Sequence, residues 1–247
     1  MTSLACGYDP AVPAESRRIL AVLFDAVGTL ILPRESVGET YARFARPHGV
    51  ELPAGRLDEA FSRVLRAAAP NVHPGLPLGE AALRERDWWR ARVRETFRAA
   101  DGSSRLSDFD ACFAQLWRHY AGAHAWRLAP GAHAGLDALA QRGLRLGVLS
   151  NFDQRLRCVL RELGLHERFE VVTLPADAGA AKPERAIFDV CLKRLGLAPQ
   201  RALYVGDQAT LDLAAAQGAG LLALDVGTLP DLAALPKAID QLEESLA

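Results

Sequence analysis

Short apolar runs without internal alternation recur along the chain. Strands that are buried on both faces of a parallel sheet have this pattern, because neither face meets water. We therefore predict five strands, within Ile19–Phe24, Leu144–Leu149, Phe169–Leu174, Ala202–Val205 and Gly220–Val226.

Between the later runs, apolar residues recur at spacings of three and four, as in helices that pack one face on a core. The pattern predicts helices over residues 132–142, 154–163, 184–195 and 210–217, with Gly143, Gly164, Gly196 and Gly218 following as C-terminal caps. Strand and helix alternate from about residue 131 to the end. This order predicts an α/β fold with a doubly wound parallel sheet, a Rossmann-like core.

Residues 37–127 have a different pattern: Arg-rich amphipathic segments with no strand-like run. We predict an all-helical cap inserted after the first strand, whose four tryptophans mainly fill its own core. Ligands of open α/β sheets bind at the carboxyl ends of the strands, so this cap would cover the ligand crevice. The predicted organisation is a tail at 1–17, an α/β core of 18–36 and 128–247, and a cap at 37–127 with hinges near 33–37 and 128–131.

Composition limits the partners and the cellular compartment that we expect for this chain. Half of the residues are hydrophobic and the formal net charge is −1, so the chain can bury a core and has no general attraction for nucleic acid or membranes. The four cysteines show neither metal-ligand nor disulfide spacing, which indicates reduced thiols and a cytoplasmic protein. We expect no signal peptide, and no apolar stretch approaches the ~20 residues that span a membrane.

Polar residues with chemical potential follow four of the predicted strands. A carboxylate can serve as a nucleophile, a hydroxyl and an amide can hold the oxygens of a transferring group, and a lysine can neutralise their charge. Two acidic residues at another strand end can hold Mg²⁺. Together these groups suit phosphoryl transfer. They are Asp25 with Gly28 and Thr29, Ser150 with Asn151, Lys182, and Asp207 with Asp212.

The segments "LFDAVGTL", "VLSNFD", "GAAKPE" and "YVGDQATLD" resemble the four motifs of the haloacid dehalogenase superfamily of hydrolases, most of which are phosphatases. The resemblance runs from about residue 18 over nearly the whole chain, cap included. The stretches "VGETYA", "RDWW" and "LSNFD" are most similar to the subfamily called haloacid dehalogenase-like hydrolase domain-containing protein 3.

The resemblance implies a role for each motif residue. Asp25 would be the nucleophile, and Ser150 with the Asn151 amide would contact the phosphoryl group of a small phosphorylated substrate. Lys182 would be the third-motif lysine, while Gly28 and Thr29 would line the substrate turn. The implied Mg²⁺ ligands are Asp25, the backbone carbonyl of Val27 and Asp207, with Asp212 acting through water or by orienting the others.

Val27 departs from the phosphatase pattern, in which the second residue after the nucleophile is an aspartate that protonates the leaving group. A positioned acid or base contributes roughly 10²- to 10⁴-fold in rate, and valine cannot transfer a proton. Valine retains a backbone carbonyl, so the metal site should persist while catalysis weakens. Candidate substitute acids are His48, His73 and Glu35.

Three functions remain open on these residues. The first is a Mg²⁺-dependent phosphatase with a relocated or missing acid. The second is a 2-haloacid dehalogenase, whose halide needs no proton, although those enzymes lack the paired Asp207 and Asp212. The third is an impaired hydrolase that binds a phosphorylated ligand. A phosphonatase-type reaction is disfavoured because residues 37–127 contain no lysine. Substrate and oligomeric state stay undetermined.

Overall fold

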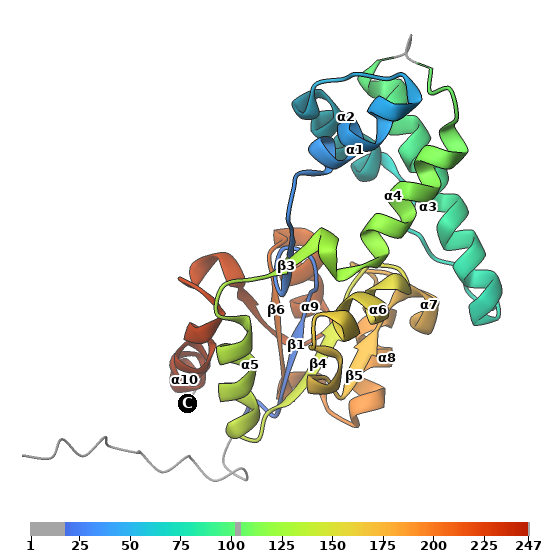
Figure 1. Ribbon diagram of the computed structural model, residues 1–247. Helices are drawn as coiled ribbons and strands as arrows, with labels where there is room; N and C mark the ends of the chain where they lie inside the picture. Colours follow the sequence, from blue (N-terminus) through green and yellow to red (C-terminus); the bar gives the residue numbers. More distant parts are fainter. Residues whose placement is uncertain (1–17, 102–104, 247) are drawn as a thin grey trace, which may run out of the picture.

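The structure is a computed structural model that describes residues 18–101 and 105–246, so the prediction for residues 1–17 lies outside the described part (Figure 1). An α/β core carries a five-stranded sheet in the order β5-β4-β1-β6-β7, with all neighbouring strands parallel. The predicted doubly wound α/β fold is confirmed. The strands are β1 Ala21–Phe24, β4 Arg145–Leu149, β5 Val171–Thr173, β6 Ala202–Gly206 and β7 Leu222–Asp225.

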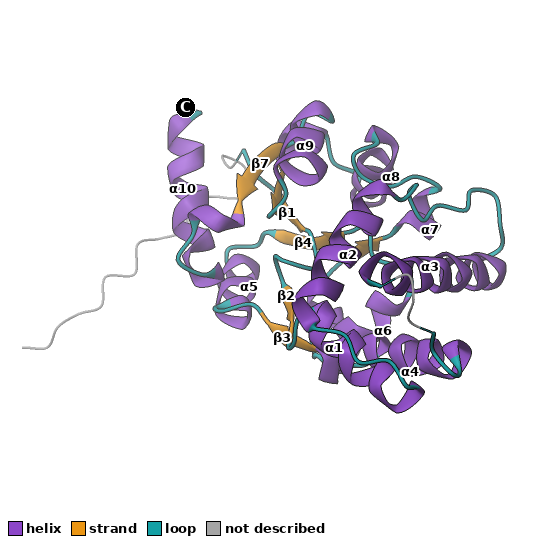
Figure 2. Ribbon diagram, turned by 90° about the horizontal axis from the view of Figure 1, so that it is seen from above, coloured by secondary structure: helices purple, strands orange, loops and turns teal. Residues whose placement is uncertain are grey.

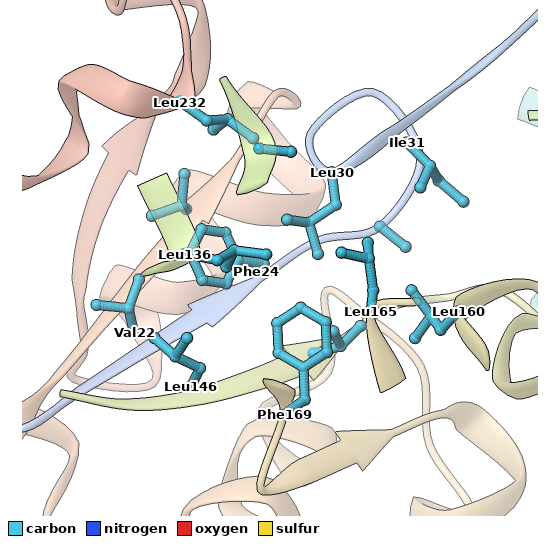
Figure 3. Close-up of a cluster of buried hydrophobic side chains, with 14 of the residues drawn as sticks. Val22, Phe24, Leu30, Ile31, Leu136, Leu146, Leu160, Leu165, Phe169 and Leu232 are labelled. Carbon is cyan, nitrogen blue, oxygen red and sulfur yellow. The ribbon is translucent and has the colours of Figure 1, made fainter. Parts of the chain in front are cut away.

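The central strand β1 is buried on both sides because its side chains alternate between two helical layers. Val22 and Phe24 lie in the apolar cluster of Figure 3, with residues of α5 Ala132–Gln141, α6 Arg155–Glu162 and α10 Leu235–Ser245. Ala21 and Leu23 face the opposite layer, formed by α8 Arg185–Leu195 and α9 Ala215–Gly218. Burial on both faces explains why the strands read as continuous apolar runs.

The cap is built from α1 Val37–Ala45, α2 Ala54–Ala67, α3 Leu78–Ala100 and α4 Phe109–Ala121. These helices share an apolar cluster of their own, which includes Tyr41, Leu57, Phe97 and Leu116. Ser36 begins α1 with a capping box, in which its hydroxyl accepts from the Glu39 amide and the Glu39 carboxylate accepts from the Ser36 amide. Figures 1 and 2 place the cap over one edge of the core.

A short antiparallel ribbon joins the cap to the core. It pairs β2 Ile31–Pro33 with β3 Trp126–Leu128. No strand was predicted within residues 37–127, and this prediction is wrong for Trp126 and Arg127. Because the chain leaves and re-enters the core side by side, pairing the two crossings satisfies backbone groups that local periodicity says nothing about.

Helix ends were predicted with one error. Gly143, Gly164 and Gly196 adopt the left-handed conformation expected of C-terminal caps, whereas Gly218 is the last residue of α9 and the left-handed residue is Gly220, with φ 91°. The predicted helix at 210–217 begins as a wide π-helical turn, Ala209–Ala214. Such turns often accompany functional sites.

The remaining short elements are α7 Pro175–Ala178 and the 3₁₀ turns Arg46–His48, Ala123–Ala125, His166–Arg168, Pro199–Arg201, Val226–Thr228 and Leu232–Ala234. Within the described residues, no helix is both long and apolar enough to cross a membrane.

Candidate active site

Three neighbouring strands end on the predicted site residues. Asp25 follows β1, Ser150 follows β4 and Asp207 follows β6. Since β1 lies between β4 and β6 and all three run parallel, their carboxyl ends meet at one edge of the sheet. Asp25, Ser150 and Lys182 are buried there, whereas Asp207 is exposed.

The Lys182 ammonium group is the centre of the site. Its Nζ donates to Asp25 Oδ1 at 2.7 Å and to Asp212 Oδ1 at 2.5 Å. It also donates to the Tyr204 hydroxyl at 2.9 Å, and that hydroxyl in turn contacts the Leu149 carbonyl oxygen at 2.9 Å. All three donor positions of the ammonium group are therefore used, and its orientation is set by groups from β1, β6 and the turn after β6.

Protonation in this cluster follows from burial and from the surrounding charges. Burial opposes the charged form of Lys182, but the two carboxylates outweigh it and raise the pKa of the lysine, which stays an ammonium group. Burial raises the pKa of Asp25; Lys182 opposes this shift and the charge of Asp212 adds to it. Asp25 consequently holds its proton more tightly than a free aspartate, and the Lys182 charge limits this rise in its pKa.

Tyr204 was not identified from the sequence as a site residue. It lies inside an apolar run, where an aromatic residue is ordinarily part of the core. The one sequence signal was its place in β6, two residues before Gly206, which ends the strand that Asp207 follows.

The Asn151 side chain braces the loop that carries Lys182. Its Nδ2 donates to the Lys182 carbonyl oxygen at 2.9 Å, and its Oδ1 accepts from the Lys182 amide at 2.7 Å. Both polar atoms of the Asn151 side chain are therefore hydrogen-bonded to the backbone of Lys182. If the chain binds a phosphoryl group as the resemblance implies, the groups of this segment left to contact it would be the backbone amide of Asn151 and the Ser150 hydroxyl.

Asp212 and Asp207 differ in their availability. Asp212 is fully buried, and its Oδ2 accepts from the amides of Asp207 at 3.2 Å and Gln208 at 3.0 Å, while Oδ1 is held by Lys182. Asp212 therefore orients the turn that carries Asp207. Burial, together with the charges of Asp25 and Asp212, raises the pKa of Asp207 to about 6.

Donor chemistry and spacing at this edge suit a Mg²⁺ ion. Asp25, Asp207 and Asp212 each offer a carboxylate oxygen, and these atoms lie within 4.8 Å of one another. Mg²⁺ prefers oxygen ligands at about 2.0–2.1 Å in an octahedron, which puts adjacent ligands about 2.9 Å and opposite ligands about 4.2 Å apart. The oxygens would therefore have to move closer together to bind one ion directly, and Asp212, whose two oxygens already accept hydrogen bonds, would act mainly by orienting the others.

Gly28 keeps the turn beside Asp25 close to Asp207. Its φ is 96°, and a Cβ at this position would lie 2.5 Å from Asp207 Oδ2. A side chain would therefore displace the Asp207 carboxylate as well as strain the backbone. The next residue, Thr29, is fully buried, and its Oγ1 has no hydrogen-bond partner among the described residues.

The valine of the first motif takes part in packing. Val27 is partly buried against the apolar cluster that contains Phe24 and Leu30, and it forms an isolated bridge with Ile31. Two residues after Asp25, the structure thus has an apolar side chain that packs on the core.

Two of the proposed substitute acids flank α1. Glu35 pairs with Arg43 at 2.9 Å, and this hydrogen bond lowers the pKa of Glu35, which makes it a poor proton donor. His48 lies in the turn after α1, where its carbonyl oxygen accepts from the Ser107 amide within the cap. Its side-chain Nε2 is buried and has no hydrogen-bond partner among the described residues.

His73 is placed differently. It lies in the cap loop between α2 and α3, with its Nε2 3.0 Å from Asn71 Oδ1. The next residue, Pro74, touches the core, since a Cβ built at Gly179 would lie 3.3 Å from the Pro74 Cβ. Gly179 begins the loop that leads to Lys182, so the His73 loop lies next to the start of that loop.

Glu85 was not singled out from the sequence. This residue of α3 is buried and accepts from the Gln154 amide at 3.3 Å and from its side-chain Nε2 at 3.4 Å. Burial and the nearby Asp153 carboxylate raise the pKa of Glu85 from 4.5 to about 7. Below about pH 7 Glu85 is therefore mainly uncharged, which avoids repulsion between its carboxylate and that of Asp153.

Glu85 should make stability depend on pH. Between about pH 4.5 and 7 the folded protein keeps a proton that the unfolded chain has lost, so stability falls as pH rises through this window. We expect Glu85→Gln, which stays uncharged, to match the wild type near pH 5 and to exceed it at pH 8 by on the order of 1–2 kcal/mol. Urea unfolding at both pH values measures this, with the exposed Glu59→Gln as control. An equal difference at both pH values would contradict the assignment.

Comparison with known proteins agrees with this geometry. A sequence profile described as haloacid dehalogenase-like hydrolase matches residues 19–220. The chain is 34% identical over 240 residues to mouse haloacid dehalogenase-like hydrolase domain-containing protein 3, covering 90% of this chain and 94% of that protein.

Solved structures with the same fold include both phosphatases and dehalogenases. One is a HAD phosphatase from Thermococcus onnurineus, with 26% identity, a TM-score of 0.56, and coverage of 84% of this chain and 86% of that one. Another is the L-2-haloacid dehalogenase from Xanthobacter autotrophicus, with 21% identity, a TM-score of 0.62, and coverage of 90% and 83%.

Proposed function

The chain belongs to the haloacid dehalogenase-like hydrolase family, and we propose that it is a Mg²⁺-dependent phosphatase that acts on a small phosphorylated metabolite through an aspartyl-phosphate on Asp25. The observation that carries the proposal is the pair Asp207 and Asp212 beside Asp25 and Lys182. A dehalogenase needs no metal, so it would have no use for a second group of carboxylates at its nucleophile.

In this proposal, Asp25 attacks the phosphorus atom. Its Oδ1 is held by Lys182 at 2.7 Å, which leaves Oδ2 to form the bond while the leaving-group oxygen departs with the electron pair of the broken P–O bond. Water then attacks the aspartyl-phosphate, releasing inorganic phosphate and restoring Asp25. A bound Mg²⁺, held by Asp25 and Asp207 with Asp212 behind them, would neutralise phosphoryl charge.

The surrounding residues would position the transferred group. Lys182 supplies positive charge beside Asp25, and the Ser150 hydroxyl and Asn151 amide supply hydrogen-bond donors from the end of β4. Asp212 keeps Lys182 and the Asp207 turn in place through its four hydrogen bonds. Catalysis by this site would depend on positioning the phosphoryl group and on stabilising its negative charge, the two effects that dominate phosphoryl transfer.

Val27 limits the substrates that the site can turn over quickly. With no carboxyl group at residue 27, the leaving group receives no proton from that position. Leaving groups that are stable as anions depend least on such a proton. We therefore propose acyl phosphates and aryl phosphates as the preferred substrate classes.

A substrate panel with and without metal tests this function. Phosphate release from acyl and aryl phosphates is expected with Mg²⁺ and should disappear after chelation of the metal. Alkyl phosphates should react far more slowly. Asp25→Asn, which keeps the shape of the side chain but lacks the nucleophilic oxygen, should abolish turnover and serves as the matched control.

L-2-chloropropionate in the same panel decides between functions. Chloride release that does not depend on metal would show that the chain acts as a dehalogenase, and the phosphatase proposal would be wrong. Tight Mg²⁺-dependent binding of phosphorylated compounds without turnover would instead favour a phospholigand-binding protein, the function to which Val27 also points.

A further inference from the structure

The core segment that follows the second motif contacts two cap helices. Trp89, on α3, donates its indole Nε1 to Asp153 Oδ2 at 2.7 Å. Glu85, one turn earlier on α3, accepts from the Gln154 backbone amide. From α4, the Trp117 carbonyl oxygen accepts from Arg155 Nη1 at 3.2 Å. The cap therefore meets the core at three consecutive residues, 153–155.

Asp153 and Arg155 form a rigid pair within the core. The Arg155 guanidinium donates to both carboxylate oxygens, from Nε at 2.8 Å and from Nη2 at 2.6 Å, and the Arg155 amide adds a third bond to Asp153 at 3.0 Å. The Asp153 side chain is only 1% exposed and that of Arg155 only 12%. A buried bidentate pair of this kind has fixed geometry.

Aromatic residues of the cap close over this pair. The Arg155 guanidinium carbon lies 3.6 Å from the centre of the Trp117 ring and 5.8 Å from that of Trp89. Such cation–π contacts strengthen when water is excluded. If the cap swung away, Asp153 and Arg155 would keep each other, while Trp89 and Trp117 would lose their core partners. The contacts of Trp89 and Trp117 with Asp153 and Arg155 can thus break and form together.

The same segment is tied directly to the active site. Ser150 Oγ accepts from the Phe152 amide at 3.3 Å, and Asn151 braces the backbone of Lys182. Only Phe152 separates these residues from Asp153. If residues 153–155 move, the short, hydrogen-bonded segment before them will therefore also shift Ser150 and Asn151 at the end of β4.

We propose that Asp153 and Arg155 form a latch for the cap, and that Trp89 is the positioning residue that closes α3 onto the loop carrying Ser150 and Asn151. Closure fixes this loop and excludes water from the site. Its effect on turnover rests on the proposed hydrolase function, whereas the latch itself can be observed without any substrate.

Hydrogen exchange of the full chain tests the latch. Trp89→Phe keeps an aromatic ring, though a smaller one, and removes the N–H donor to the charged Asp153, a hydrogen bond whose loss corresponds to roughly 10- to 100-fold in an equilibrium. We expect the Gln154 amide, which is bonded to Glu85, to exchange about 10- to 100-fold faster, while amides of β1 are unchanged. Trp88→Phe is the matched control, because Trp88 donates to Ala69 within the cap, and it should leave Gln154 unchanged.

Two further measurements separate a latch from a merely structural contact. Arg155→Lys keeps the charge but loses the bidentate geometry and should also speed exchange at Gln154. With a substrate in hand, Trp89→Phe should raise KM about tenfold and lower kcat much less. Unchanged exchange at Gln154 in both variants, or faster exchange that spreads equally to β1, would overturn the proposal even if no substrate is found.

Discussion

Lys182→Met is expected to lower the free energy of unfolding at pH 8 by about 3–5 kcal/mol and to abolish turnover. Removing one partner of a buried ion pair leaves the other uncompensated, and losses of about this size are typical. Here the single ammonium group serves both Asp25 and Asp212, which are buried beside it. Methionine fills the space of the lysine stem but cannot satisfy either carboxylate.

The loss in Lys182→Met should depend on pH. Without the ammonium group, only the hydrogen bond from Ser150 still opposes the effects of burial and of Asp212, which raise the pKa of Asp25 in the folded protein. The unfolded chain releases this proton near pH 4 and the folded variant keeps it to higher pH, so the variant loses stability as pH rises above about 4. The deficit against wild type should therefore be smaller at pH 5 than at pH 8.

Chemical denaturation at the two pH values measures this result. Lys193→Met is the matched control, because Lys193 is exposed on α8 and should tolerate the change within about 0.5 kcal/mol. A Lys182→Met protein as stable as wild type at pH 8 would show that the two carboxylates do not depend on the lysine, and the electrostatic account of the site would be wrong.

Val27→Asp is expected to raise the turnover of alkyl phosphates by roughly 10²- to 10⁴-fold, the usual contribution of a positioned acid. Residue 27 lies on the turn that follows Asp25 and is partly exposed, so a carboxyl group there can keep contact with solvent. Aryl phosphates, whose leaving groups need no proton, should gain much less. Steady-state kinetics on one alkyl and one aryl phosphate compare the two.

Val27→Asn is the control for Val27→Asp. It has nearly the same shape and polarity as aspartate but cannot donate or accept the catalytic proton. Equal kinetics for the Asp and Asn variants would mean that a missing acid is not what limits this site. Both variants replace an apolar side chain that packs on the core cluster, so stability should be measured alongside activity.

Local pattern was sufficient for much of the fold. The strand β1 is apolar at every position because helices cover both of its faces, and this leaves a signal that can be read from the sequence. Asp25, Ser150 and Asp207 could be grouped as one site for a related reason. Each directly follows a strand of a predicted parallel sheet, and the carboxyl ends of such strands share an edge.

Only the tertiary structure decided which residues far apart in the chain contact one another. The sequence could not show that Tyr204 and Asp212 hold Lys182, or that Trp89 reaches Asp153 from the cap. It also gave no sign of the strand at Trp126, which exists because the two crossings between core and cap run side by side. Hydrophobic periodicity records which face of an element is buried, but not which distant element covers that face. These contacts depend on the path of the whole backbone, so they became visible only in the folded chain.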